Sequence, residues 1–117
     1  MKANELRIGN WVEQPNDGVT RVTAILNDLQ IKTETGYIDK YCRPIPLTEE
    51  WLLKFGFRGN ERQRVKRFVG LEIYTKDLWR YNTKGNNALV VEYVHQLQNL
   101  YFALTGEELE LKERQDA

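Results

Sequence analysis

The stretch VTRVTAILNDLQIKTETGYIDKYC, residues 19–42, decides the fold class of this chain. Two dipeptides typical of turns, ND at 27–28 and TG at 35–36, divide it into three segments rich in apolar and β-branched side chains. The middle segment, residues 29–33, alternates between apolar and polar side chains, and this period of two indicates a strand. The stretch therefore predicts consecutive antiparallel strands joined by tight turns.

Similar signals precede this stretch. LRI at 6–8 alternates, WV at 11–12 follows it, and PNDG at 15–18 combines the fixed φ of proline with residues that tolerate positive φ. Four short strands with tight turns predict an antiparallel meander over residues 1–43. We expect the meander to curl into a small barrel or half-barrel, because curling reduces the unpaired edge of the sheet. A sheet shared with the later strands is the alternative.

PIPLTEEWLLKFGF, residues 44–57, predicts a short helix with an extended lead-in. Two prolines keep the first residues extended, and the Thr48 side chain can accept a hydrogen bond from an early helical N–H. Glu49 and Glu50 follow at the positive N-terminal end of the helix, where carboxylates are favourable. Gly56 supplies the left-handed residue that ends a helix.

Strand patterns return after residue 58 and are followed by a second helix. In residues 94–105, leucines and a tyrosine recur at spacings of three and four, and Gly106 marks the helix end. The strands expected between the two helices are residues 64–69, 71–76, 78–82 and 88–91. The whole chain, residues 1–117, therefore predicts one β-rich α+β domain: an antiparallel meander or small barrel (1–43), a first helix with its lead-in (44–57), a second antiparallel meander (58–92), a C-terminal helix (93–106) and an acidic tail (107–117).

The composition is that of a folded domain without crosslinks. Of the 117 residues, 41% are hydrophobic, which is enough for one core. The single cysteine, Cys42, excludes an internal disulfide, favours a reducing compartment and is expected to be a small buried apolar residue. No apolar run approaches the about 20 residues of a membrane span, so we expect a cytoplasmic protein with no membrane contact.

No group of side chains in the sequence predicts catalysis. His95 is the only histidine, no Ser or Cys nucleophile is tied to it in sequence, and one histidine cannot form a zinc site without further ligands. We expect His95 to be a surface or helix-start residue that hydrogen-bonds locally. The glycine spacing of a phosphate-binding loop is absent. The chain is therefore predicted not to be an enzyme and to use no metal or cofactor.

Charge is unevenly distributed along the chain, although 17 basic and 17 acidic residues give a formal net charge of zero. Residues 58–84 hold eight basic and three acidic residues, whereas residues 85–117 hold two basic and six acidic residues. The middle of the chain is thus the region most suited to a negatively charged partner.

The segment RGNERQRVKRF, residues 58–68, carries most of this positive charge, and aromatic side chains flank it or follow in a nearby strand. Basic side chains beside aromatic faces are typical of single-stranded nucleic-acid recognition. The alternative without a binding role is a solvated hairpin whose charges keep the edge of a sheet from pairing with another chain. An acidic protein is a further candidate partner, as is a homo-oligomer in which this region meets the acidic residues 107–116 of another copy. The residues predicted to contact nucleic acid or a protein partner are Arg58, Arg62, Arg64, Lys66, Arg67, Phe68, Trp79, Arg80 and Tyr81.

Three segments of the chain resemble a family of small proteins of bacterial prophages and other mobile elements. They are ELRIGNWV (5–12), PIPLTEEWLLKFGF (44–57) and YVHQLQNLYFALTGEELEL (93–111), of which the last is the most specific. The family has no assigned activity, cofactor or catalytic residues, so the resemblance gives no residue a role. It implies a phage or mobile-element accessory protein of a bacterial cytoplasm.

The charge pattern therefore favours a non-enzymatic binding module that contacts nucleic acid through residues 58–84. The alternative is a protein-interaction or self-assembling accessory protein, for example an inhibitor of a host protein.

Overall fold

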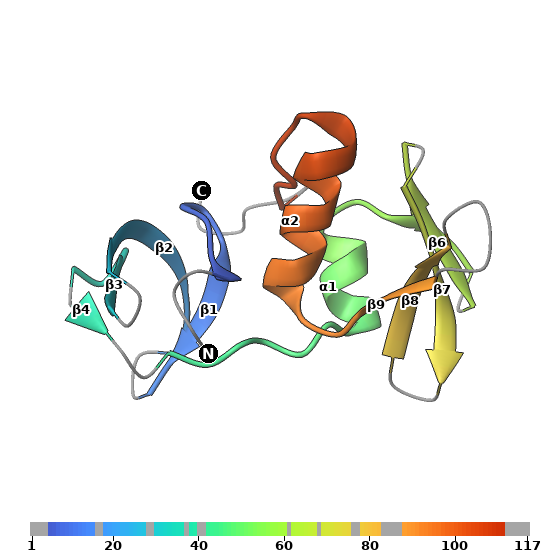
Figure 1. Ribbon diagram of the computed structural model, residues 1–117. Coiled ribbons are helices and arrows are strands. Elements are labelled where there is room, and N and C mark those ends of the chain that lie inside the picture. Colours follow the sequence, from blue (N-terminus) through green and yellow to red (C-terminus); the bar gives the residue numbers. More distant parts are fainter. Residues whose placement is uncertain are drawn as a thin grey trace. The chain divides into compact units, whose positions relative to one another are not determined.

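The chain forms eleven regular elements in the part that the structure, a computed structural model, describes (Figure 1). The residues described are 5–15, 18–27, 30–36, 38–39, 42–60, 62–67, 69–75, 78–82 and 88–111. The elements are β1 (Trp11–Gln14), β2 (Gly18–Asn27), β3 (Gln30–Thr33), β4 (Ile38–Asp39), α1 (Glu49–Lys54), β5 (Arg58–Gly59), β6 (Gln63–Lys66), β7 (Val69–Thr75), β8 (Leu78–Asn82), β9 (Ala88–Val91) and α2 (Val94–Thr105).

These elements form two antiparallel sheets and two helices, which confirms the predicted α+β class. By their contacts, the residues divide into two compact units. The first unit comprises Met1–Pro46 and Tyr93–His95, and the second comprises Leu47–Glu92 and Gln96–Ala117. From the sequence we expect one domain for the whole chain, and this stays a prediction.

The first unit contains a four-stranded meander in the order β1-β2-β3-β4. Alternate side chains of its strands point inward, as the period of two in the sequence predicted. Its core includes Cys42, so the expectation that this cysteine is buried is confirmed. The clustered core residues are Leu6, Val12, Val22, Ile31 and Cys42.

The segment that follows β4 returns to the free edge of β1. The backbone N–H of Glu13 donates to the Arg43 carbonyl at 2.9 Å, and the N–H of Arg43 donates to the Glu13 carbonyl at 2.7 Å. This isolated antiparallel bridge covers part of the edge that an open four-stranded sheet would leave unpaired.

The predicted strand at residues 6–8 is wrong, because the chain makes a tight turn there. Asn10 accepts a hydrogen bond from the Arg7 N–H on its side-chain oxygen at 2.6 Å and returns its own N–H to the Arg7 carbonyl at 3.0 Å. Gly9 has a φ of 97°, which suits glycine. The side-chain amide of Asn10 therefore competes successfully with a strand in this segment.

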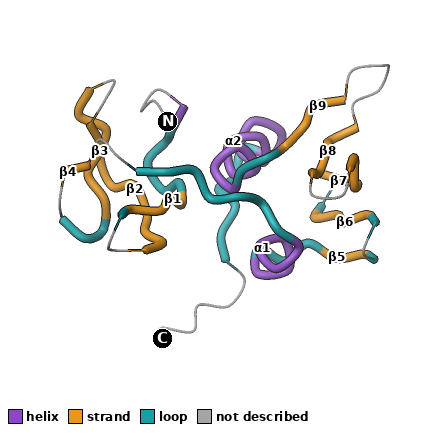
Figure 2. Tube along the Cα trace, turned by 90° about the horizontal axis from the view of Figure 1, so that it is seen from below, coloured by secondary structure: helices purple, strands orange, loops and turns teal. Residues whose placement is uncertain are grey.

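The second unit contains a five-stranded meander in the order β5-β6-β7-β8-β9. Figures 1 and 2 both show α1 and α2 on the same side of this sheet. Large apolar side chains of the sheet and of both helices are buried in this unit, which makes the sheet face toward the helices its inner face. The buried apolar residues are Leu47, Leu52, Phe55, Phe57, Val69, Leu71, Trp79, Val91, Leu97, Tyr101 and Leu109.

The two helices follow their sequence signals closely. Thr48 is the N-cap of α1, and its hydroxyl accepts the Trp51 N–H at 3.4 Å, as the sequence predicted. Gly56, with a φ of 89°, lies just beyond α1, and Gly106, with a φ of 76°, follows α2. With only six residues, α1 depends on packing more than on its own propensity.

The strand boundaries of the second unit differ from the sequence prediction in two places. The turn expected at Gly70 falls instead after Lys66, because Lys66 pairs with Val69 across β6 and β7. Arg67 adopts the left-handed conformation there, with a φ of 54°, although this region rarely accepts a side chain. The short strand β5 had no signal in the sequence.

No helix among the described residues has both the length and the apolar character needed to cross a membrane.

Candidate ligand-binding site on the five-stranded sheet

The strand register of the second unit sorts the predicted contact residues onto two faces. Directly opposite residues of neighbouring antiparallel strands point to the same face. One row therefore lies on the inner face, and the neighbouring row lies on the outer face. The inner row is Arg64, Leu71, Tyr81 and Leu89, and the outer row is Gln63, Glu72, Arg80 and Val90.

Arg64 lies on the inner face and is bound within its own unit. Only 8% of the residue is exposed, and its guanidinium forms an ion pair with Glu49 of α1. A second hydrogen bond, of 3.2 Å, joins its Nη1 to the Gly59 carbonyl. A buried charge with these partners supports the packing of α1 on the sheet, since removing a partner would leave the charge unpaired.

Lys66 has a similar internal role. Its ammonium group donates a 2.7 Å hydrogen bond to the Phe55 carbonyl just after α1. The same nitrogen lies 5.7 Å from the ring centroid of Tyr101 in α2, which is within cation–π range. This lysine therefore joins the sheet to both helices.

The aromatic residues of the predicted contact set belong largely to the inner face. Trp79 is buried in the core, and Tyr81 is half-buried in the inner row. Neither ring forms an open stacking platform. Phe68, the third aromatic residue of the set, lies outside the described residues.

Two further arginines are paired with carboxylates near the surface. Arg67 donates to Glu107 at 2.8 Å, and Arg80 donates to Glu72 through Nε at 2.7 Å. The Arg67 pair joins the basic region to an acidic residue of the same chain. Glu107 therefore gives Arg67 a partner within the same chain. The homo-oligomer expected from the sequence would instead pair the basic region with the acidic residues of another copy.

The remaining arginines of the set, Arg58 and Arg62, are exposed. Within the described ranges, no residue hydrogen-bonds or pairs with either guanidinium. Arg58 lies opposite Val65, a half-exposed residue, and so projects to the outer face with it. These two side chains are the basic groups best placed to meet a ligand.

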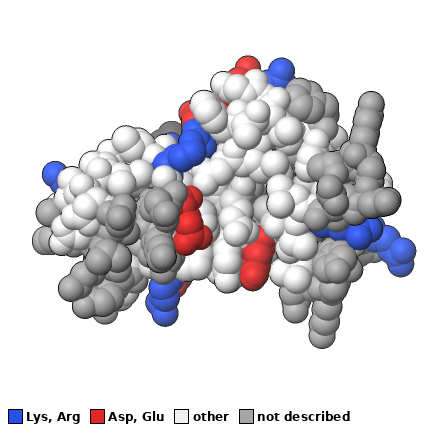
Figure 3. Space-filling view, in the orientation of Figure 1, with Lys and Arg blue, Asp and Glu red and all other residues white. Residues whose placement is uncertain are grey.

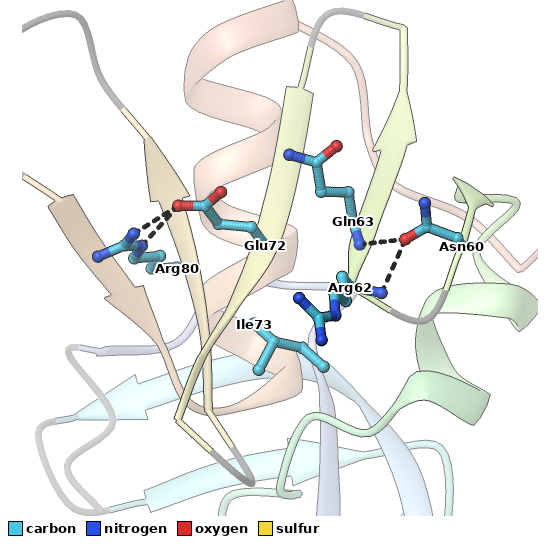
Figure 4. Close-up of a pocket in the computed structure, with 6 residues that line it drawn as sticks. All are labelled: Asn60, Arg62, Gln63, Glu72, Ile73 and Arg80. Atoms are coloured by element: carbon cyan, nitrogen blue, oxygen red, sulfur yellow. Dashed lines mark hydrogen bonds and ion pairs between the residues drawn. The ribbon is translucent and has the colours of Figure 1, made fainter.

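Arg62 lines a pocket of about 570 Å³ near one end of the outer row, shown in Figure 4. The Arg80–Glu72 pair forms one side of it, and the Ile73 side chain lies beside Arg62. The volume is in the range of small-molecule sites. The described lining residues are Asn60, Arg62, Gln63, Glu72, Ile73 and Arg80, so its charged groups are two arginines and one carboxylate.

The turn between β5 and β6 fixes the position of Arg62. The Asn60 side-chain oxygen accepts the N–H groups of Arg62 at 2.8 Å and of Gln63 at 3.0 Å. Gly59 has a φ of 142°, and a Cβ atom there would collide with the Gln63 carbonyl. The Arg62 carbonyl accepts the Ile73 N–H at 2.9 Å, which ties the turn to β7.

Sequence reasoning missed four of the six lining residues, namely Asn60, Gln63, Glu72 and Ile73. Asn60 directly follows a glycine, and this pair is typical of turns, so a turn at this position could have been predicted. The other three are ordinary strand residues, and only the register shows that they meet. Charge in the sequence found the arginines but not the polar surface around them.

The basic side chains of the described residues form no continuous surface on the face seen in Figure 3. Lys and Arg atoms appear there as small separate groups, one of them over the five-stranded sheet. Two basic residues of β6, Arg64 and Lys66, point to the inner face and are bound there, so they add little to an exposed basic surface.

His95 belongs to the first unit and lies at the start of α2, which confirms its predicted helix-start position, but it is buried, so the alternative of a surface position is wrong. The residue is 1% exposed, and neither ring nitrogen has a hydrogen-bond partner among the described residues. Its ring stacks on Tyr93 at a centroid distance of 6.0 Å, and Nε2 lies 4.0 Å from a Glu5 carboxylate oxygen. Burial lowers the pKa of His95, and the Glu5 carboxylate opposes this in part.

In the part of the chain that the structure describes, no three His, Cys, Asp or Glu side chains gather as a metal site would require. The charged pocket, where Gln63, Glu72 and Arg80 of the outer row meet Asn60, Arg62 and Ile73, thus remains the candidate functional site of the described residues.

Comparison with protein-family models, curated proteins and solved structures finds no match to this chain. The resemblance to prophage proteins stays a prediction from sequence.

Proposed function

We propose that this protein is a non-enzymatic binding module that contacts the phosphate groups of single-stranded nucleic acid through the pocket that Arg62 lines. Arg62 is the central contact, and Arg58 is a second contact on the same sheet. The observation that carries the proposal is the exposed Arg62 guanidinium, which lines a pocket and has no carboxylate partner in the described ranges.

The polar groups around Arg62 suit a phosphate. A guanidinium can donate two parallel hydrogen bonds to phosphate oxygens, and such charge-assisted bonds are stronger than neutral ones. Gln63 adds an exposed side-chain amide that no described residue engages. Ile73 offers an apolar surface, 41% exposed, on which part of a sugar or base can lie.

The number of free cations sets the expected strength of binding. Two phosphate contacts give a slope of about −1.4 for log affinity against log salt on a single strand. This small slope predicts weak binding with little sequence discrimination, because phosphate contacts position a strand and do not read its bases.

The direct test is fluorescence anisotropy with a labelled single-stranded oligonucleotide at two salt concentrations. Replacing Arg62 with alanine should weaken binding about tenfold, the effect of losing one charge-assisted contact. Arg43→Ala is the matched control, because it removes the same charge from an exposed arginine that pairs with Glu13 in the first unit. Equal affinity of wild type and Arg62→Ala would contradict the proposal.

Competition experiments distinguish a nucleic-acid strand from a free nucleotide as the source of the phosphate. They also distinguish a nucleic-acid partner from a protein partner. A mononucleotide that competes as well as the oligonucleotide would point to a free nucleotide as ligand. An acidic peptide that binds while the oligonucleotide does not would replace nucleic acid with a protein partner. A self-assembling module is the second candidate function, and β9, the uncharged edge strand of the five-stranded sheet, supports it.

The proposed setting is the cytoplasm of a bacterium that carries a prophage or mobile element, as the sequence resemblance implies.

A further inference from the structure

The pocket that Arg62 lines contains a second arginine, Arg80 of β8, which is held by a carboxylate. Arg80 lies directly opposite Glu72 of β7 in the outer row. Its Nε donates to Glu72 Oε1 at 2.7 Å, and its Nη2 lies 2.7 Å from the same oxygen. The carboxylate offsets the charge of Arg80, so a phosphate in the pocket gains less attraction from Arg80 than from Arg62.

The two contacts with Glu72 also determine how the Arg80 guanidinium is presented. The N–H bonds of a guanidinium lie in its plane. A carboxylate bound through Nε and Nη2 therefore sits at the edge of the group and covers neither of its flat faces (Figure 4). Because both contacts are on the same edge, they also restrict rotation of the guanidinium. Glu72 thus holds a flat group in a fixed orientation.

Part of the Arg80 side chain is accessible from solvent. It is 34% exposed with Glu72 bound to it. Figures 1 and 2 show both helices on the other side of the sheet, so neither helix covers the outer row. Val90 of β9 lies opposite Arg80 in the same row and is 41% exposed. The outer face therefore presents a flat guanidinium beside an apolar side chain.

We propose that the Arg80 guanidinium is a stacking surface for one nucleobase of the bound strand, while Arg62 holds a neighbouring phosphate. This inference rests on the proposed function and adds the base to the groups that the pocket recognises. Planar guanidinium groups stack on bases as aromatic rings do. Glu72 supports this role, because a plane that is already oriented loses little freedom when a flat ligand binds it.

The alternation of β8 explains why an arginine and not an aromatic ring takes this role. Trp79 and Tyr81 precede and follow Arg80 in the strand, and both belong to the inner face. Arg80, between them, points to the outer face. Every base has a flat face, so stacking on Arg80 tolerates any sequence. This agrees with the weak sequence discrimination expected from phosphate contacts.

Two labelled single strands with equal numbers of phosphates test the proposal by fluorescence anisotropy. One is oligothymidylate, and the other is an abasic strand of the same length. The wild-type chain should bind oligothymidylate at least about fivefold more tightly, the smallest effect expected from stacking one base. Arg62→Ala should weaken the binding of both strands by a similar factor, because it removes a phosphate contact that both strands can make.

The variant Arg80→Lys separates the flat face of the arginine from its charge. Lysine keeps a positive charge beside Glu72 but has no planar group. It should weaken oligothymidylate binding about fivefold and leave abasic-strand binding and the salt slope unchanged. Arg67→Lys is the matched control, because Arg67 forms a similar ion pair with Glu107 and does not line the pocket. It should leave both affinities unchanged.

Equal wild-type affinity for the two strands, with Arg62→Ala still weakening both, would overturn base stacking and leave the phosphate contact standing. An Arg80→Lys chain with wild-type circular dichroism that loses affinity equally for both strands would also overturn it, since the base would then not be recognised. If neither strand binds, the proposed function fails and this inference fails with it.

Discussion

The two faces of the five-stranded sheet use their basic residues in opposite ways. On the inner face, Arg64 pairs with Glu49, and Lys66 is bound to a carbonyl beside α1. On the outer face and its adjoining turn, Arg58 and Arg62 are exposed and have no carboxylate partner among the described residues. The inner cations stabilise the second unit, and the outer cations are available to a ligand.

This difference shows that a basic cluster in sequence need not be a basic surface. Residues 62–67 include four basic side chains, yet these are distributed among the core, a hairpin turn and the pocket. Arg64 and Lys66 share the inner face of β6 and are bound there. Nearby carboxylates pair with two of the arginines that reach the surface, Arg67 and Arg80. Only the remaining cations can contribute to binding.

The largest expected effect comes from removing an inner-face cation. Arg64→Ala should lower the free energy of unfolding by about 2 kcal/mol, since it removes the ion pair, the bond to the Gly59 carbonyl and buried packing. Glu49 is partly exposed, so the loss stays below that of a fully buried pair. Urea unfolding measures it. Arg58→Ala should change stability by less than about 0.5 kcal/mol, and equal losses in both variants would break the comparison.

The buried His95 side chain sharpens the comparison through the pH dependence of stability. Because burial places the pKa of His95 below the 6.5 of an unfolded histidine, the unfolded chain binds more protons as the pH falls. Stability should therefore decrease below about pH 6.5, by up to about 1.4 kcal/mol per pH unit. Chemical unfolding at several pH values measures the slope.

The variant His95→Phe isolates this effect, because the chain has no other histidine. It should remove most of the slope between about pH 5.5 and 6.5 while keeping a ring to stack on Tyr93. An unchanged slope in this variant would show that other groups cause the pH dependence.

A smaller effect is expected for the second inner-face cation. Lys66→Met keeps an apolar stem but loses the hydrogen bond to Phe55 and the charge near Tyr101, so stability should fall by about 1 kcal/mol.

The control for Lys66 is Lys54→Met. Lys54 also lies over an aromatic ring, that of Trp51, and pairs with Glu50 at 3.2 Å, but its side chain is more than half exposed. Thermal unfolding should show a change within about 0.5 kcal/mol for this exposed pair. If Lys54→Met is the more damaging substitution, the internal role of Lys66 is contradicted.

Much of the fold was predictable from local signals. The bounds of α2, its stop at Gly106 and the Thr48 cap of α1 follow directly from periodicity and capping residues. The meander order was predictable because tight turns leave successive strands little choice but to pair. The turn at Arg67 was not, since its left-handed φ belongs to a residue type that rarely adopts it.

The candidate site was predictable only in part. Sequence charge identified Arg58, Arg62 and Arg80, but it could not separate free from paired cations. The pairing of Arg67 with Glu107 joins residues 40 positions apart, and no local pattern reports such a contact. The burial of His95 was missed for a similar reason, because packing around it decides its exposure and the helix pattern does not.

The rate at which a guanidinium-specific dicarbonyl reagent modifies each arginine of the native chain tests the central claim most directly. Mass spectrometry of the digested protein gives the rate for each site. Arg58 and Arg62 should react several-fold faster than Arg64, because only exposed and unpaired guanidinium groups are open to the reagent. Modification of Arg64 at the same rate as Arg58 and Arg62 would contradict the division of the basic residues between the two faces of the sheet.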